Sequence, residues 1–263
     1  MHLPFLSLLV AALLGGCSSL PTGQPPTGPG QSAWGASSLP PLGRTSAVEA
    51  ASDAWRHHAL PGKSVTQFSY ARHEGRDAVV AVADASASLL RRKLRIEPAD
   101  LALARFSWRV PELIAGADMA LRDADDSPAR IILSFEGDRS RFSQRDAMLS
   151  ELAHTLTGEP MPYATLMYVW CNTRPVGTVI RSPRTDRIRK LVIESGPARL
   201  NRWTDHERDI GADFERAFGE KPGALTGIAI MTDTDNTRGK AKAWYGPVRL
   251  VARGAPLAAP AAR

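Results

Sequence analysis

The stretch Ile228-Ala229-Ile230-Met231-Thr232-Asp233-Thr234-Asp235-Asn236-Thr237 joins an apolar run to a group of acids. Four consecutive apolar residues are typical of a buried strand. The carboxylates of Asp233 and Asp235 and the amide of Asn236 are therefore expected at the edge of a core. Such a group can bind a cation, contact a sugar hydroxyl, pair with an arginine or fold a turn.

Period-two apolar patterns surround this stretch along most of the chain. A hairpin turn is predicted at His73-Glu74-Gly75-Arg76. Short strands that do not alternate with helices favour an all-β-dominated, jelly-roll-like β-sandwich over a doubly wound α/β fold. The other predicted strands are Val65–Tyr70, Ala78–Ala83, Ala87–Ile96, Ala102–Val110, Ile131–Phe135, Leu166–Trp170, Leu191–Ile193 and Val248–Val251.

Three helical stretches interrupt the strands, so we expect two or three peripheral helices. Ser46-Ala47-Val48-Glu49 is a capping box before a helix that ends at Leu60-Pro61-Gly62. Thr204-Asp205-His206-Glu207 is a second one, before a helix with Gly219 as its C-cap. The third helix, Ser143 to Thr157, places four apolar residues on one stripe: Met148, Leu149, Leu152 and Leu156.

The N-terminus resembles that of a bacterial lipoprotein. Residues 1–16 are a predicted signal peptide, because Phe5 to Leu14 is apolar but too short to span a bilayer. The following Leu14-Gly15-Gly16-Cys17 is similar to a lipobox, although no Lys or Arg precedes it. The resemblance implies that Cys17 is lipidated and anchors the chain to a membrane. With Ser18 rather than Asp after it, the sorting rule of Gram-negative bacteria implies the outer membrane, facing the periplasm.

The remaining chain divides into a tether, one domain and a tail. Residues 17–44 are predicted to be a flexible Pro/Gly/Ser tether, with six prolines and no acid after Cys17. Residues 45–251 are predicted to be a single β-sandwich domain, and residues 252–263 a disordered tail. With Cys17 lipidated, Cys171 is the one thiol left, so it is expected as a buried small side chain.

The chain is basic, with a formal net charge of +6 and a pI of about 9.7. Because the protein is expected to be exported, nucleic acid is not its expected partner. The positive charge then favours envelope anions such as lipopolysaccharide phosphates, anionic glycans or phospholipid headgroups. Two basic groups are expected as solvated faces or, alternatively, as an anion-binding patch: Arg91, Lys93 and Arg95, and Arg181, Arg184, Arg187, Arg189 and Lys190.

A second acidic segment, Asp123 to Asp126, precedes the strand that contains Ile131. If neighbouring strands bring Asp125 and Asp126 to Asp233 and Asp235, the acids can pair with Arg109 or Arg130. Ligand binding and a structural Ca²⁺ are the alternatives. An EF-hand is excluded, because Arg238 and Trp244 stand where that loop needs Gly and Glu. We expect no cofactor and no metal site.

No sequence motif indicates a catalytic function. The sequence lacks a Gly-x-Ser-x-Gly elbow and a phosphate-binding loop, and its six histidines lack metal-ligand spacing. A non-enzymatic protein is therefore expected, with a carboxylate pair in a carbohydrate-active hydrolase or lyase as the alternative. Trp108 with Arg109, and Trp170, suggest a glycan-stacking platform, while the competing interpretation places both tryptophans in the core.

Several motifs together resemble one family of exported bacterial domains of unknown function, number three thousand and forty-seven. They are Ala87-Ser88-Leu89, Phe106 to Val110, Asp125 to Arg130, Tyr168-Val169-Trp170, Arg208-Asp209 with Phe218-Gly219, and Met231 to Thr237. The resemblance runs from about Trp55 to Leu250 and implies a common domain without an established activity. The expected architecture is also similar to that of carbohydrate-binding modules.

The sequence thus predicts an envelope lipoprotein that binds an envelope glycan, such as peptidoglycan or another polysaccharide, or another envelope component. A carbohydrate-active enzyme and a structural assembly partner are the alternatives. Apart from Cys17, the candidate residues for a ligand site or a structural network are Trp108, Arg109, Asp125, Asp126, Arg130, Trp170, Asp233, Asp235 and Asn236.

Overall fold

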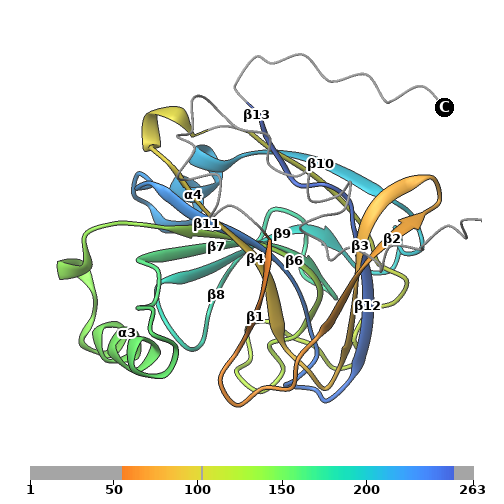
Figure 1. Cartoon of the computed structure of the whole chain (residues 1–263), viewed down its shortest axis with the longest axis horizontal. Helices are drawn as coiled ribbons and strands as arrows, with labels where there is room; N and C mark the ends of the chain where they lie inside the picture. The colour runs from red at the N-terminus through yellow and green to blue at the C-terminus, as the bar shows by residue number, and fades with distance from the viewer. Residues whose placement is uncertain (1–54, 102, 252–263) are drawn as a thin grey trace, which may run out of the picture.

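The computed structural model describes residues 55–101 and 103–251, and two β-sheets make up most of this part (Figure 1). The predicted signal peptide, Cys17, the tether, the capping box at Ser46 and the tail at 252–263 lie outside the described residues. Within the described part, no helix is both long and apolar enough to cross a membrane.

The larger sheet has seven strands, with β11 next to its centre. Only β7 and β9 pair in parallel; the other neighbours are antiparallel. Along the ladder between β11 and β6, the register shifts between Met231 and Asp233, where Pro128 removes a backbone donor. The strand order is β1 (Arg56–Ala59), β4 (Ser88–Ile96), β11 (Leu225–Asp233), β6 (Ser127–Phe135), β7 (Ala164–Cys171), β9 (Ile188–Ser195) and β8 (Val179–Arg181).

The second sheet has six strands and packs on one face of the first. Its order is β10 (Thr204–Asp209), β5 (Leu103–Arg109), β12 (Lys240–Tyr245), β3 (Arg76–Asp84) and β2 (Gln67–His73), with β13 (Arg249–Val251) also paired to β5. The predicted hairpin turn joins β2 and β3: Glu74 and Gly75 both have positive φ, 49° and 77°, as a tight two-residue turn requires.

Aromatic side chains fill the space between the sheets. Phe106 stacks on Tyr168 at 5.6 Å between ring centroids, and Trp108 lies 6.3 Å from Trp170. Tyr245 links the sheets through its hydroxyl, which donates to Met231 O at 2.6 Å and accepts from Arg130 N at 3.3 Å. This link fixes the strand ends that carry the acids. The predicted all-β, jelly-roll-like sandwich with peripheral helices is confirmed.

Two segments predicted as parts of helices are strands. Residues 56–59 form β1, which pairs with β4, so His57 and His58 lie in a strand. Thr204 to Glu207 lies in β10, paired with β5, and is not a capping box. Helix α4 (Ile210–Phe218) begins instead after Asp209, whose Oδ1 accepts from Ala212 N at 3.0 Å, and ends at the predicted Gly219. Strands β8 and β12 were not predicted from the sequence.

Helix α3 (Gln144–Thr157) is present where it was predicted. Its apolar stripe faces solvent instead of packing on the sandwich. Met148, Leu152 and Leu156 are 66%, 52% and 59% exposed. The buried face is polar: Asp146 accepts from Thr185 Oγ1, and Ser150 accepts from Arg139 Nη1 at 3.0 Å. The helix is therefore held to the sandwich by hydrogen bonds and leaves its apolar face free.

Candidate ligand-binding groove

The seven-stranded sheet carries a groove on the face that is turned away from the core between the sheets. Because side chains alternate along a strand, Ile131 and Leu133 of β6 face the core, while Arg130 and Ile132 face the groove. Met167 of β7 and Lys190 of β9, together with Met231 of β11, continue this floor. The groove has a volume of about 480 Å³, within the range of about 300–1,000 Å³ typical of small-molecule sites.

Two walls rise from the ends of the sheet. Leu60, Pro61 and Lys63, which follow β1, form one wall. Helix α3 and the loop behind it form the other, with Ala153, Leu156, Glu159, Pro160 and Met161.

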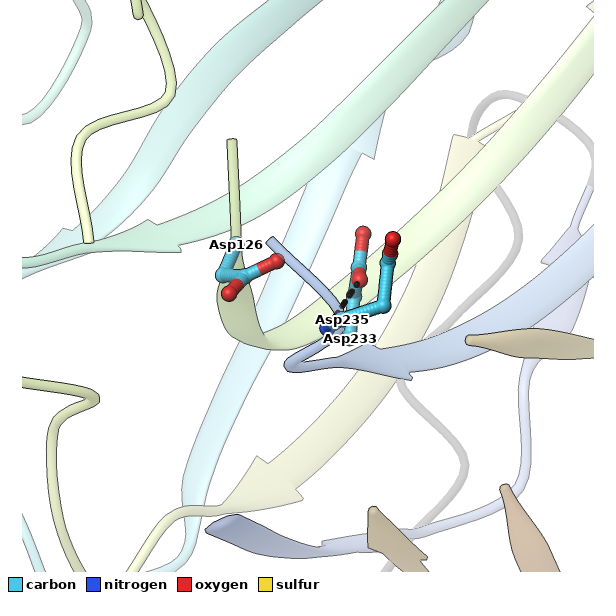
Figure 2. A group of neighbouring side chains, drawn as sticks. All are labelled: Asp126, Asp233 and Asp235. Atoms are coloured by element: carbon cyan, nitrogen blue, oxygen red, sulfur yellow. Dashed lines mark hydrogen bonds between the residues drawn. The ribbon is translucent and has the colours of Figure 1, made fainter. Parts of the chain in front are cut away.

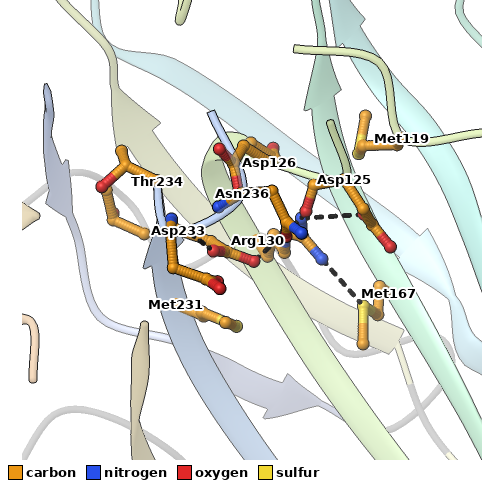
Figure 3. Close-up of polar contacts among 12 residues, drawn as sticks. Met119, Asp125, Asp126, Arg130, Met167, Met231, Asp233, Thr234 and Asn236 are labelled. Carbon is orange, nitrogen blue, oxygen red and sulfur yellow. Dashed lines mark hydrogen bonds and ion pairs between the residues drawn. The ribbon is translucent and has the colours of Figure 1, made fainter. Parts of the chain in front are cut away.

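Arg130 lies at the centre of a charged network in the floor and is only 3% exposed. Its Nη2 donates to Asp125 O at 2.8 Å and to Asp125 Oδ1 at 3.2 Å, and lies 3.1 Å from Asp233 Oδ2 (Figure 3). One guanidinium thus joins the two acidic segments, which the sequence places more than a hundred residues apart.

Lys190 completes the network from β9. Its Nζ donates to Met119 O at 2.8 Å and to both carboxylate oxygens of Asp125, at 2.7 and 2.6 Å. Burial, with the nearby charge of Arg130, lowers the pKa of Lys190 to about 8. The prediction of Lys190 on a solvated face is wrong: it is 1% exposed, because its strand alternates toward the groove.

Asp126 and Asn236 fasten the loops at the end of the groove. The carboxylate of Asp126 accepts from Asn236 N at 3.2 Å, Thr237 N at 2.7 Å and Thr237 Oγ1 at 2.6 Å. The amide of Asn236 donates to Arg122 O at 3.1 Å. These bonds occupy Asp126, so its role is to hold the turn after β11 against the segment before β6.

Asp233 and Asp235 form an acid pair beside that turn (Figure 2). Burial raises the pKa of Asp233 well above its usual range, and the hydrogen bond to Asp235 adds to this effect, although Arg130 opposes it. Burial acts in the same direction on Asp235, but hydrogen bonds from Lys63 and Asp233 lower its pKa. Of the two carboxyl groups, Asp233 is therefore the one that takes up a proton first as the pH falls.

Oxygen atoms of Asp126, Asp233 and Asp235 lie within 4.8 Å of one another, as a metal site would need. The surrounding charges weigh against the structural Ca²⁺ considered from the sequence. Arg130 lies 3.1 Å from Asp233 Oδ2, and Lys63 pairs with Asp235. Positive charges in these positions repel a divalent cation.

Trp108, Trp170 and Arg109 do not reach the groove. Both tryptophans are completely buried between the sheets, so they cannot stack on a ligand, and the glycan-platform interpretation is wrong for them. Arg109 pairs with Glu74 at 3.1 Å and lies 5.0 Å from the ring centroid of Trp244. It is therefore not the arginine that pairs with the two aspartate segments.

Sequence reasoning missed Lys63, Lys190 and the wall from α3 as parts of the site. The sequence did contain a signal for this second face, because apolar residues occupy consecutive positions of two strands. Successive side chains point to opposite faces, so Ile131 and Ile132, or Ile230 and Met231, cannot both face one core. A sheet with two apolar faces predicts a covered or ligand-binding second face. Cys171 is a buried free thiol on this second face, as expected of a small apolar side chain.

The packed sheets and the groove define the protein as a β-sandwich with a ligand-sized groove on the free face of one sheet. Residues 53–249 match the family described as protein of unknown function (DUF3047), and the chain belongs to this family. No curated protein matches the chain in sequence.

Two solved structures illustrate the similarities of the fold. The xyloglucanase domain of NopAA, a type three effector from Sinorhizobium fredii solved in complex with cellobiose, is 9% identical with a TM-score of 0.42, over 77% of this chain and 95% of that one. Endoglucanase cel12A from Rhodothermus marinus is 12% identical with a TM-score of 0.41, over 75% and 97%. Likeness at this level carries no information on activity.

Proposed function

We propose that the protein is an envelope-anchored binding protein whose ligand lies in the groove. One observation supports this function above the others: a groove of about 480 Å³ combines an apolar floor with a buried network of Arg130, Lys190 and two aspartates. Apolar pockets with a few convergent polar groups are the usual form of ligand sites. The ligand is an envelope component, either a glycan or an amphiphile.

The envelope location rests on the lipobox-like stretch at Cys17. We expect the mature chain to begin at Cys17 and to sit in the outer membrane, facing the periplasm. A Cys17→Ser variant is the test: it should enter the soluble periplasmic fraction without the mass of acyl chains. A variant that stays in the membrane fraction contradicts lipid anchoring.

The groove itself is tested by filling it from α3. Ala153 is half-buried and lines the groove, so Ala153→Trp should block ligand entry. Ala147 is exposed on the same helix and lies outside the groove, which makes Ala147→Trp the matched control. Binding of peptidoglycan, lipopolysaccharide and extracted envelope lipids is measured with each variant. If no ligand distinguishes the two variants, the groove is not the binding site.

A carbohydrate-active enzyme is the second candidate, because the acid pair Asp233–Asp235 lines the groove. The hydrogen bond between these carboxyl groups places them closer than the roughly 5–9.5 Å used by glycosidase pairs, which favours binding over hydrolysis. Polysaccharides are incubated with the wild type, Asp233→Asn and Asp235→Asn. Turnover that both variants lose supports an enzyme; no turnover by the wild type counts against it.

A further inference from the structure

We infer that the groove binds a fatty acid, with the aliphatic chain along the sheet and the carboxylate at the basic residues of the groove. This inference rests on the proposed function and names the ligand class of the same site. Three independent features of the described residues support it: the chemistry of the lining, the orientation of α3 and the balance of charge.

The lining is aliphatic rather than aromatic. Among the described residues that line the groove, none is Trp, Tyr or Phe, so the large aromatic faces on which sugar rings usually stack are missing, and the imidazole of His58 is the one aromatic ring there. The floor and first wall consist largely of flexible or branched aliphatic side chains, which adapt to a hydrocarbon chain: Leu60, Leu89, Ile132, Met167, Ala229 and Met231.

Helix α3 extends this apolar surface beyond the groove. Leu156 lines the groove and is also 59% exposed, and Met148 and Leu152 continue the stripe outward on the same helix face. A helix that buries Asp146 and Ser150 and exposes leucines gains no stability from those leucines. Their position instead provides a continuous apolar path from solvent to the floor of the groove.

The charge of the lining complements one anion. Five cationic side chains line the groove, namely Lys63, Arg91, Arg130, Arg184 and Lys190, against four acids, Asp125, Asp233, Asp235 and Glu159. The balance of the lining is therefore positive by one with every acid ionised.

Two groups within this set are incompletely partnered. Arg184 donates to Arg122 O at 2.9 Å and forms no ion pair within the described part of the chain, although its charge acts on Asp235. Arg130 Nε is buried and has no hydrogen-bond acceptor. A carboxylate would supply the missing negative charge and an acceptor, whereas a neutral sugar would supply no charge and a quaternary amine would add to the excess.

Three amphiphiles with the same twelve-carbon chain separate the effect of the head from that of the chain: dodecanoate, dodecyl maltoside and dodecyltrimethylammonium. Each is titrated into the purified mature chain by calorimetry below its micelle concentration. We expect one dodecanoate per chain, bound at least about tenfold more tightly than either other head, a difference of roughly 1.4 kcal/mol. Each methylene removed from the acid should weaken binding by about fourfold, as expected for a buried chain.

Two variants locate the bound acid. Arg184→Glu should weaken dodecanoate by about tenfold or more and narrow its preference over dodecyl maltoside. Arg181→Glu, an exposed residue outside the groove, should not. Ala153→Trp should abolish the binding that Ala147→Trp retains.

The outcomes separate this inference from the proposed function. Any of three results overturns the fatty-acid inference: dodecanoate does not bind, all three amphiphiles bind equally well, or Ala153→Trp leaves dodecanoate binding intact. If a glycan then binds in a manner sensitive to Ala153→Trp, the groove is still the binding site and only the ligand class is wrong. If no ligand is sensitive to that variant, both proposals fail. The titrations of the wild type stand even where a variant does not fold.

Discussion

Replacing Arg130 with methionine removes the cation that joins the two acidic segments under the groove. The change keeps an unbranched apolar side chain in a position that is 3% exposed. Asp125 keeps Lys190, which contacts both of its carboxylate oxygens. Asp233 loses the one ion-pair partner it has among the described residues, at 3.1 Å from its Oδ2.

The expected cost follows from what is left uncompensated. Removing one partner of a buried ion pair costs about 3–5 kcal/mol. Here the lower end applies, because Asp125 retains a cation and Asp233 can hold its proton. We therefore expect Arg130→Met to lower the free energy of unfolding by about 3 kcal/mol at pH 7. Adding Asp233→Asn removes the unpaired acid, so the double variant should recover roughly 1–2 kcal/mol relative to additivity.

Urea unfolding followed by circular dichroism measures each free energy, with Arg95→Met as the control. Arg95 is exposed and pairs with Glu97 and Glu136 at 2.7 Å in contact with solvent, so its replacement should cost much less stability than that of Arg130. A loss of under about 1 kcal/mol for Arg130→Met, or strict additivity in the double variant, refutes the claim that this network holds the floor.

Three further perturbations test other parts of the structure. Burial lowers the pKa of His206 to about 4, so the stability present above the unfolded pKa near 6.5 is lost as the pH falls toward 4, by roughly 3 kcal/mol. His206→Gln should flatten this dependence in urea titrations between pH 7 and 4, and parallel curves for the two proteins would exclude His206 as its source. Burial raises the pKa of Asp233, so its contribution to stability is present below its ordinary pKa of about 3.8 and declines as the pH rises above it. Asp233→Asn cannot ionise, so its stability relative to the wild type should rise from pH 4 to 7, and a relative stability that stays constant over this range contradicts the raised pKa. Gly223→Ala should lower the free energy of unfolding by about 1–3 kcal/mol, because the added Cβ would lie 2.1 Å from Glu136 O. Gly227→Ala is the control, since its Cβ would lie 3.5 Å from Arg92 O, and thermal unfolding should show a smaller loss for it.

The strands of the core could be predicted because their signal is local. The apolar run Ile228 to Met231 forms part of β11, and the turn at Glu74-Gly75 is marked by a glycine, which adopts positive φ without steric cost. The capping-box pattern failed at Thr204 because long-range pairing decided the outcome. Thr204 pairs with Trp108 of β5 and is the first of six successive residues of β10 in that ladder. A short polar strand is stabilised by its neighbour, which the local pattern does not contain.

The orientation of α3 shows the same limit for a helix. Its periodicity predicts the stripe of Met148 and Leu152 but not the side on which the sandwich lies. That side is decided by Thr185, which bonds Asp146 across 39 residues of sequence. The network in the groove depends on still longer separations: Lys190 contacts Asp125 across 65 residues, and Asn236 contacts Asp126 across 110. Acids and bases were visible in the sequence, but their pairing required the strand order.

Buried charge on this face bears on what the face is for. The opposite face of the same sheet is filled by residues such as Ile131, Leu133 and Tyr168, which close the core without ion pairs of their own. Well-packed apolar side chains in place of Arg130, Lys190 and their partners would be neutral or stabilising, because desolvation of each ion offsets its Coulomb gain. Stability alone therefore does not account for the network. The buried charges are better explained as part of a site that binds a ligand, and the excess positive charge of the lining indicates that this ligand is negatively charged.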